Sequence, residues 1–300
     1  MGDADQVWLA RFLDTLRDQR RLSPHTVAAY RRDLERLLKF CREQDVASWS
    51  KLDEHHIRAW ISAEHRRGLG GRSLQRALSA LRALFRFLLE EGVVSAYPAG
   101  DVRAPKTPRK LPHTLDVDQA VRLVEVTGEG PLAGRDRAIL ELFYSSGLRL
   151  AELVSLDLGD LDLADAVVQV VGKGNKSRRV PVGRHAVEAL QAWLQHRAAL
   201  AKPEQTALFV NRRGMRLSPR GVQDRLKHWA RRQGIEINVH PHLLRHSFAS
   251  HMLESSGDLR AVQELLGHAD ISTTQIYTHL DFQHLARVYD QAHPKARKKE

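Results

Sequence analysis

The 300-residue chain is 42% hydrophobic and carries 47 Lys and Arg residues against 36 Asp and Glu residues, a formal net charge of +11. This composition excludes a chain disordered throughout, and the basic excess makes nucleic acid the first partner to consider. An arginine-rich source proteome would give the same excess, so the motifs must decide. The single cysteine, Cys41, excludes an intrachain disulfide and a thiolate zinc cluster and fits a reducing compartment.

Membrane and export signals are not evident in the sequence. No run approaches the ~18 apolar residues of a membrane span, and the start MGDADQVWLARFLDTL is too charged for a secretory signal. We therefore expect a cytoplasmic protein without membrane contact.

Residues 7–91 predict four amphipathic helices. Apolar residues recur there at steps of three and four, as in Tyr30, Leu34 and Leu37. Ser23-Pro24 supplies a cap and a proline at the first helical position of the second helix, and the fourth helix is expected to end at Gly92. An N-terminal helical domain, residues 1–97, follows from this pattern.

Residues 98–112, PAGDVRAPKTPRKLP, are rich in proline and basic residues and offer little to bury. This composition is typical of an extended interdomain linker. It fits a basic segment lying along DNA phosphates and a solvated tether equally well.

Residues 113–300 predict a second, mainly helical domain with a small β element. The alternating stretch LDLADAVVQVVGKGNKSRRVPVG indicates a β-hairpin or a three-stranded sheet around the turn GKGNKS. Helices are expected near 116–126, 131–145, 184–200, 219–233, 241–255, 258–266, 270–278 and 282–290.

Breaking a phosphodiester without hydrolysis requires a nucleophile, cations for the developing charge, and a proton donor for the leaving oxygen. In HPHLLRHSFASHML, His242 and Arg245 are three residues apart, so both project from one helix face. Further on, His268 ends one predicted helix and Tyr277 lies near the end of the next. Taken singly, each residue also fits a packing, capping or ion-pair role.

Zinc binding by the histidines of the same stretch is an alternative. It involves His240, His242, His246 and His251, but no HExxH motif, cysteine or suitably placed carboxylate accompanies them. No metal and no other cofactor is therefore expected.

The order of the motifs is more specific than any one of them. In order, these motifs are GLRLAEL around Arg149, Lys173 in the hairpin turn, HxLRH, LGH and a tyrosine nine residues later. Over most of residues 113–280, they resemble those of the tyrosine recombinase (phage integrase) family. SPHTVAAYRRDLERLLKF and YTHLDFQHLARVYDQAHPKARKK are similar to the branch that resolves chromosome dimers. The resemblance implies a two-domain C-shaped clamp, with an N-terminal SAM-like helical bundle and a catalytic domain.

The resemblance implies a covalent mechanism. Tyr277 would attack the scissile phosphate and form a 3′-phosphotyrosyl link, with no need for metal or ATP. Because a free tyrosine has a pKa near ~10, it needs a proton acceptor, and His242 is placed to assist. Lys173 would protonate the departing 5′-oxygen.

The remaining site residues would bind the phosphate. Arg149 and Arg245 would form the clamp on its non-bridging oxygens, and His268 would add a hydrogen bond. Glu152, three residues after the first arginine, would orient that arginine as a supporting acceptor.

Partners are implied in the same way. They are double-stranded DNA at a specific recombination site, a related XerD-like recombinase in a heterotetramer, and an FtsK-like septal DNA translocase. The apolar stripe Phe282, Leu285, Val288 and Tyr289 would dock on the neighbouring protomer or pack on its own core.

Two other functions compete with dimer resolution. One is the integrase of a mobile element, which uses the same catalytic residues; the C-terminal match and the lack of an arm-type DNA-binding domain before Val7 argue against it. The other is an architectural DNA-binding protein with an inactive site, which the complete set of catalytic residues disfavours.

Overall fold

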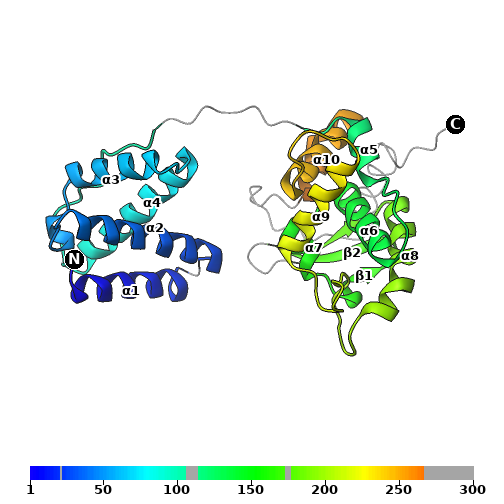
Figure 1. The fold of residues 1–300 in the computed structure, drawn as a ribbon, viewed down its shortest axis with the longest axis horizontal. Helices are drawn as coiled ribbons and strands as arrows, with labels where there is room; N and C mark the ends of the chain where they lie inside the picture. Colours follow the sequence, from blue (N-terminus) through cyan, green and yellow to red (C-terminus); the bar gives the residue numbers. More distant parts are fainter. Residues whose placement is uncertain (21, 106–113, 173–176, 267–300) are drawn as a thin grey trace. The chain divides into compact units, whose positions relative to one another are not determined.

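The computed structural model describes residues 1–20, 22–105, 114–172 and 177–266. Its chain divides into two compact units, Met1–Leu111 and Pro112–Glu300 (Figure 1). The helices predicted at 270–278 and 282–290 and the turn that carries Lys173 lie outside the described residues. Across those described residues, every helix is too short or too polar to cross a membrane.

The N-terminal unit contains the predicted helices. They are α1 (Asp3–Asp18), α2 (Pro24–Glu43), α3 (Glu54–Arg66) and α4 (Gly71–Glu90), with a 3-10 turn, η1 (Trp49–Lys51), before α3. As predicted, Ser23 caps α2, accepting a hydrogen bond from the Thr26 amide. Helix α1 begins earlier than expected because the Asp5 carboxylate accepts a hydrogen bond from the Gly2 amide and satisfies that helix end.

The first residues of the predicted linker belong to the core of this unit. Ala99 and Val102 are buried in it, although the sequence indicated little to bury there. The Arg82 guanidinium donates hydrogen bonds to the carbonyls of Ala99, Gly100 and Val102, acceptors that an extended tether would leave to water. Residues 106–113 lie outside the described part of the chain, so the end of the linker stays a prediction.

The second unit combines helices with an antiparallel sheet in the order β1-β2-β3. Its strands are β1 (Leu161–Asp162), β2 (Val167–Val171) and β3 (Ser177–Pro181), preceded by the 3-10 turn η2 (Leu158–Asp160). Its helices are α5 (Val117–Val124), α6 (Pro131–Ser146), α7 (Leu150–Ser155), α8 (Arg184–Leu200), α9 (Pro219–Arg232), α10 (Pro241–Ser256) and α11 (Leu259–Leu266). The predicted fold class, mainly α with a small sheet, is confirmed.

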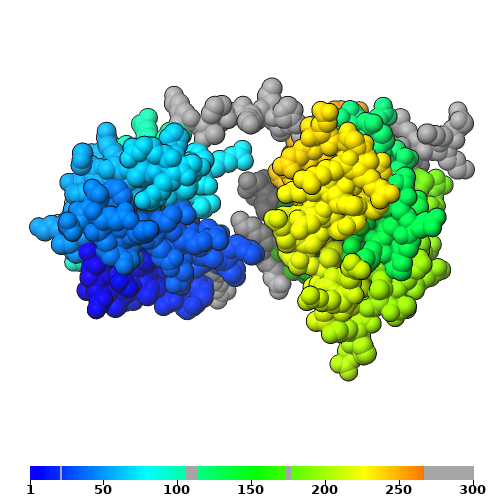
Figure 2. Space-filling model, viewed as in Figure 1, coloured from blue at the N-terminus to red at the C-terminus, as the bar shows by residue number. Residues whose placement is uncertain are grey.

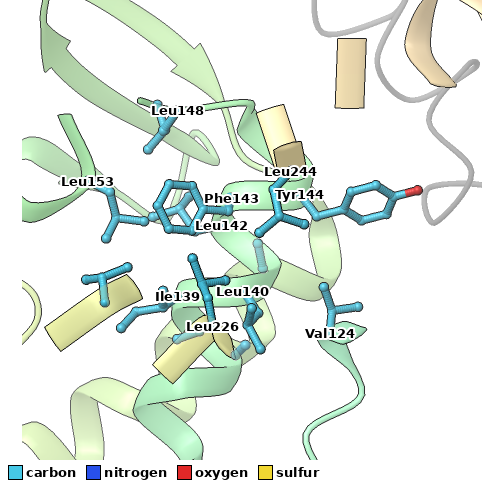
Figure 3. Packing of buried hydrophobic residues seen from close by; sticks show 14 of the residues in the cluster. Val124, Ile139, Leu140, Leu142, Phe143, Tyr144, Leu148, Leu153, Leu226 and Leu244 are labelled. Atoms are coloured by element: carbon cyan, nitrogen blue, oxygen red, sulfur yellow. The ribbon is translucent and has the colours of Figure 1, made fainter. Parts of the chain in front are cut away.

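Helix α6 is the centre of the second unit. Most of its residues are buried, and it packs along α8 and α10. Figure 3 shows Leu142 and Phe143 from α6 beside Leu226 and Leu244 from α9 and α10. The Tyr144 hydroxyl points away from this cluster and hydrogen-bonds His251 Nδ1 at 3.0 Å. The end of α6 is therefore held firmly, and the candidate site begins at that end.

Candidate active site

The site starts where α6 ends at Gly147. This residue has a left-handed backbone, with φ of +57°, and an added Cβ would lie 2.4 Å from Phe248 Cδ1. Only glycine fits both the conformation and the space. The turn allows α7 to begin at once, with Arg149 as its N-cap residue.

Arg149 donates two hydrogen bonds to Glu152 at the start of α7. The Arg149 amide donates to Glu152 Oε2 at 2.8 Å, and its guanidinium donates to Oε1 at 2.9 Å. Glu152 is 3% exposed, whereas the Arg149 side chain is 41% exposed. The carboxylate therefore serves as an anchor inside the protein for a guanidinium that reaches the surface.

Arg178 on β3 also binds Glu152 and was not identified from the sequence. Arg149, Arg178 and Glu152 form a charged cluster. The Arg178 guanidinium binds the carboxylate with both terminal nitrogens, at 2.8 and 3.1 Å. The signal was present, because Arg178 alternates with the apolar Val180 and shares its face of the strand. Nothing in the sequence, however, indicated that this face would meet α7.

Arg245 on α10 joins the cluster from a distant part of the chain. It is buried and donates to the Gly147 carbonyl and to the Leu266 carbonyl, both at 2.6 Å. A guanidinium has five N–H donors, and the described residues offer acceptors for only part of them. Arg245 is therefore fixed beside the turn that precedes Arg149, with N–H donors that the described residues do not use.

The electrostatics of the site are dominated by positive charge. Burial, and then the nearby Arg149 and Arg178, lower the pKa of Arg245 to about 10, while Glu152 opposes the shift. Arg245 is thus still charged at neutral pH but is destabilised by its surroundings. Burial would raise the pKa of Glu152, but hydrogen bonds from Arg178 and Arg149 outweigh it and hold that pKa below its ordinary value. An anion bound here would relieve the repulsion among the guanidinium groups.

His242 lies exposed in the first turn of α10, one turn before Arg245. Its ring stacks on that of His240, with centroids 6.4 Å apart. His240 caps α10, because its Nδ1 accepts a hydrogen bond from the Leu243 amide, and burial followed by His242 lowers the pKa of His240. The structure therefore gives His242 the accessibility that a proton acceptor needs.

The zinc alternative gains no support from the same helix. His251 is buried and bonds Tyr144 and the Leu115 carbonyl through its two ring nitrogens. Among the described residues, no group of three or more His, Cys, Asp and Glu side chains is arranged to hold a metal ion.

Lys173, His268 and Tyr277 lie outside the described residues, so their roles stay predictions. Two of them are nevertheless close in the chain to residues of the described site. Arg245 binds the carbonyl of Leu266, two residues before His268. Lys173 belongs to the segment between β2 and β3, the strand that carries Arg178.

Comparison with known proteins places this chain in a family. Residues 113–284 match the Phage integrase family, and residues 9–92 match the Phage integrase, N-terminal SAM-like domain. The chain is 57% identical over 298 residues to Tyrosine recombinase XerC of Xanthomonas campestris pv. campestris (strain B100), covering 99% of this chain and 92% of that protein. It is 56% identical over 291 residues to Tyrosine recombinase XerC of Pseudomonas fluorescens, covering 97% of each.

Solved structures of recombinases are also similar to this chain. The XerA recombinase is 29% identical with a TM-score of 0.51, covering 97% of this chain and 99% of that one. The XerH site-specific recombinase bound to its palindromic difH substrate in a post-cleavage complex shares the fold, with a TM-score of 0.69 at 24% identity and coverage of 94% and 84%. The chain belongs to the phage integrase family of tyrosine recombinases.

Proposed function

We propose that the protein is a site-specific tyrosine recombinase that cuts and rejoins double-stranded DNA and resolves chromosome and plasmid dimers in the cytoplasm at cell division. The observation that carries this proposal is the hydrogen bond from Arg245 to the Gly147 carbonyl, which brings the second arginine beside the first. The extensive identity to XerC recombinases supports the same function.

The arginine cluster suits a phosphodiester in its transition state. Arg149 and Arg245 each provide a delocalised cation with several N–H donors, which match the non-bridging phosphate oxygens. Their hydrogen bonds strengthen as charge develops on the pentacoordinate phosphorus, and this differential binding accelerates the reaction. Glu152 keeps the cluster from being purely repulsive before DNA arrives.

The chemistry proceeds by exchange of one ester for another. The Tyr277 oxygen forms a bond to phosphorus while the bond from phosphorus to the 5′-oxygen breaks. His242 assists removal of the tyrosine proton, His268 hydrogen-bonds the phosphate, and Lys173 protonates the 5′-oxygen as it leaves. A 5′-hydroxyl from a second strand reverses these steps and reseals the DNA.

Helix α9 offers a surface for the DNA backbone. Its inner face is buried through Val222, Leu226 and Trp229. Its outer face is hollowed and mainly basic, lined by Arg220, Asp224, Lys227, His228, Arg231 and Arg232. This helix lies in the yellow surface of the second unit in Figure 2. Lys227 and Arg231, four residues apart, lie on the same helix face, which fits contact with neighbouring phosphates.

The partner assignment rests on kinship with XerC proteins. Within the proposal, an XerD-like recombinase completes a heterotetramer on the recombination site, and an FtsK-like translocase activates exchange at the septum. The segment 282–290 docks on the neighbouring protomer.

A suicide substrate tests the function. The site is first located by DNase footprinting of the replication-terminus region of the source genome, with and without a partner recombinase. A duplex nicked beside the scissile phosphate should then trap a covalent adduct, because the short cleaved fragment diffuses away before religation. Tyr277→Phe should abolish this adduct. Absence of any adduct with the wild-type protein and its partner would contradict the proposal.

A further inference from the structure

Strand β3 places two adjacent arginines on opposite faces of the sheet. Arg178 is paired with the buried Val170, and Arg179 is paired with the exposed Gln169. Accordingly, the Arg178 side chain is 10% exposed, whereas that of Arg179 is 44% exposed and forms an ion pair with Asp165. A guanidinium on the inner face of a strand is costly to desolvate unless a carboxylate binds it. The partner of Arg178 therefore defines its role.

That partner is Glu152, whose carboxylate binds Arg178 and Arg149 equally. Each carboxylate oxygen accepts one hydrogen bond from Arg178 and one from Arg149. A two-pronged guanidinium contact fixes the plane of a carboxylate, which a single contact leaves free to rotate. The plane set by Arg178 is therefore also the plane that directs the Arg149 guanidinium.

Stability alone explains this pair poorly. Buried ion pairs contribute little net stability compared with apolar residues of the same size. In addition, the Arg178 Nε group is buried and has no hydrogen-bond partner within the described residues. The pKa of Arg245 is lowered mainly by burial, then by Arg149, and least by Arg178, which adds a third positive charge near the site. The arrangement concentrates positive charge where the protein has no need of it for folding.

We propose that Arg178 is a positioning residue for DNA cleavage, which holds the Glu152 carboxylate in the orientation that aims Arg149 at the non-bridging oxygens of the scissile phosphate. This inference rests on the proposed recombinase function. It assigns Arg178 no contact with the phosphate and no part in protonating the leaving group.

Single-turnover cleavage of the suicide substrate at saturating protein tests the role. Arg178→Gln should slow cleavage about 10–100-fold, since a misplacement of about 1 Å at a reacting centre has effects of that size. Arg179→Gln removes the same charge from the neighbouring position and should change the rate by less than about threefold, as a surface ion pair does little. Arg178→Lys keeps the charge but cannot make the two-pronged contact with Glu152, so its cleavage should be at least about fivefold slower than that of wild type. Full activity of Arg178→Lys would overturn the proposal.

Two modified substrates separate positioning of Arg149 from other defects. A methylphosphonate at the scissile position carries no negative charge, so it depends less on the arginine clamp, and the deficit of Arg178→Gln should shrink several-fold on it. A 5′-bridging phosphorothiolate has a leaving group that needs no proton donor, so it should leave the deficit unchanged. Rescue by the phosphorothiolate alone would place the defect in leaving-group protonation and overturn the proposal, as would an equal deficit on all three substrates.

A double variant covers the case in which Arg178→Gln folds poorly. Glu152→Gln/Arg178→Gln replaces the ion pair with two neutral amides of similar shape and leaves no buried charge without its partner. If Arg178 acts through Glu152, the double variant should cleave no more slowly than Glu152→Gln alone, and a further tenfold loss would overturn the proposal. Failure of the wild-type protein to form an adduct contradicts the recombinase function, whereas equal cleavage by wild type and Arg178→Gln contradicts only the positioning role.

Discussion

Arg245 donates a 2.6 Å hydrogen bond to the carbonyl of Gly147, a residue 98 positions earlier in the chain. The bond runs from the second turn of α10 to the turn that precedes α7. It fixes one arginine of the proposed phosphate clamp to the backbone that presents the other.

The Gly147 turn should tolerate no side chain. Gly147→Ala places a Cβ against Phe248 and forces a left-handed backbone on alanine, so we expect a loss of about 2–4 kcal/mol in the free energy of unfolding. Cleavage should fall as well, because the acceptor of Arg245 moves. Chemical denaturation and suicide-substrate cleavage measure the two effects. Gly159→Ala, at a glycine with open space around it, serves as the control and should be near neutral.

Loss of Arg149 should be more damaging to chemistry than loss of Glu152. Arg149→Ala removes a donor to the transition state, for which about 10²–10³ in rate is expected. Glu152→Ala should slow cleavage less but destabilise the protein more, since it leaves the buried Arg178 without its carboxylate. Cleavage rates and thermal unfolding of both variants give the comparison. Equal rate losses would contradict a supporting role for Glu152.

The Glu152 ion pairs should make stability depend on acid pH. The folded protein holds the pKa of Glu152 below its ordinary value of 4.5, so the unfolded state binds the proton more readily. The stabilisation is fully present above about pH 4.5 and is lost as pH falls through the lower folded pKa. Denaturation of wild type and Glu152→Gln between pH 7 and pH 3 should show a stability gap that narrows below about pH 4.5. A constant gap would contradict the lowered pKa.

The outer face of α9 should contribute to salt-dependent DNA binding. Each phosphate contact that a variant removes should reduce the slope of log K against log salt by about 0.9. Lys227→Ala/Arg231→Ala should therefore give a clearly shallower slope in a fluorescence anisotropy titration. Arg17→Ala is the control, because Arg17 is surrounded by Asp14 and Asp18 on α1. An unchanged slope for the α9 variant would exclude this helix from the DNA interface.

Truncation should separate DNA binding from strand exchange. A chain ending at Leu280 lacks the segment 282–290, so we expect it to bind the recombination site but lose coordinated exchange with the partner recombinase. A chain ending at Pro294, which lacks only the basic tail, should still recombine. Gel-shift and recombination assays run side by side provide the test, and normal recombination by the shorter chain would refute the docking role.

Much of the molecule could be predicted from local pattern. Helix α4 follows from apolar residues spaced at the helical period, and the hairpin follows from alternation around GKGNKS, because both signals depend only on neighbours in sequence. Glu152 was identified for the same reason, since residues three apart meet at a helix start.

Two relationships required the tertiary structure. Arg178 becomes part of the site only because the inner face of β3 packs against α7, and the sequence records the alternation but not the neighbour. Ala99 and Val102 are buried because they pack into the core of the N-terminal unit, where Arg82 from α4 binds their carbonyls. By itself the sequence determined which residue types were present and how they repeat, and from these its family and chemistry were inferred. Which arginines meet around one carboxylate was decided by packing, because contacts between distant segments depend on the whole core rather than on any local pattern.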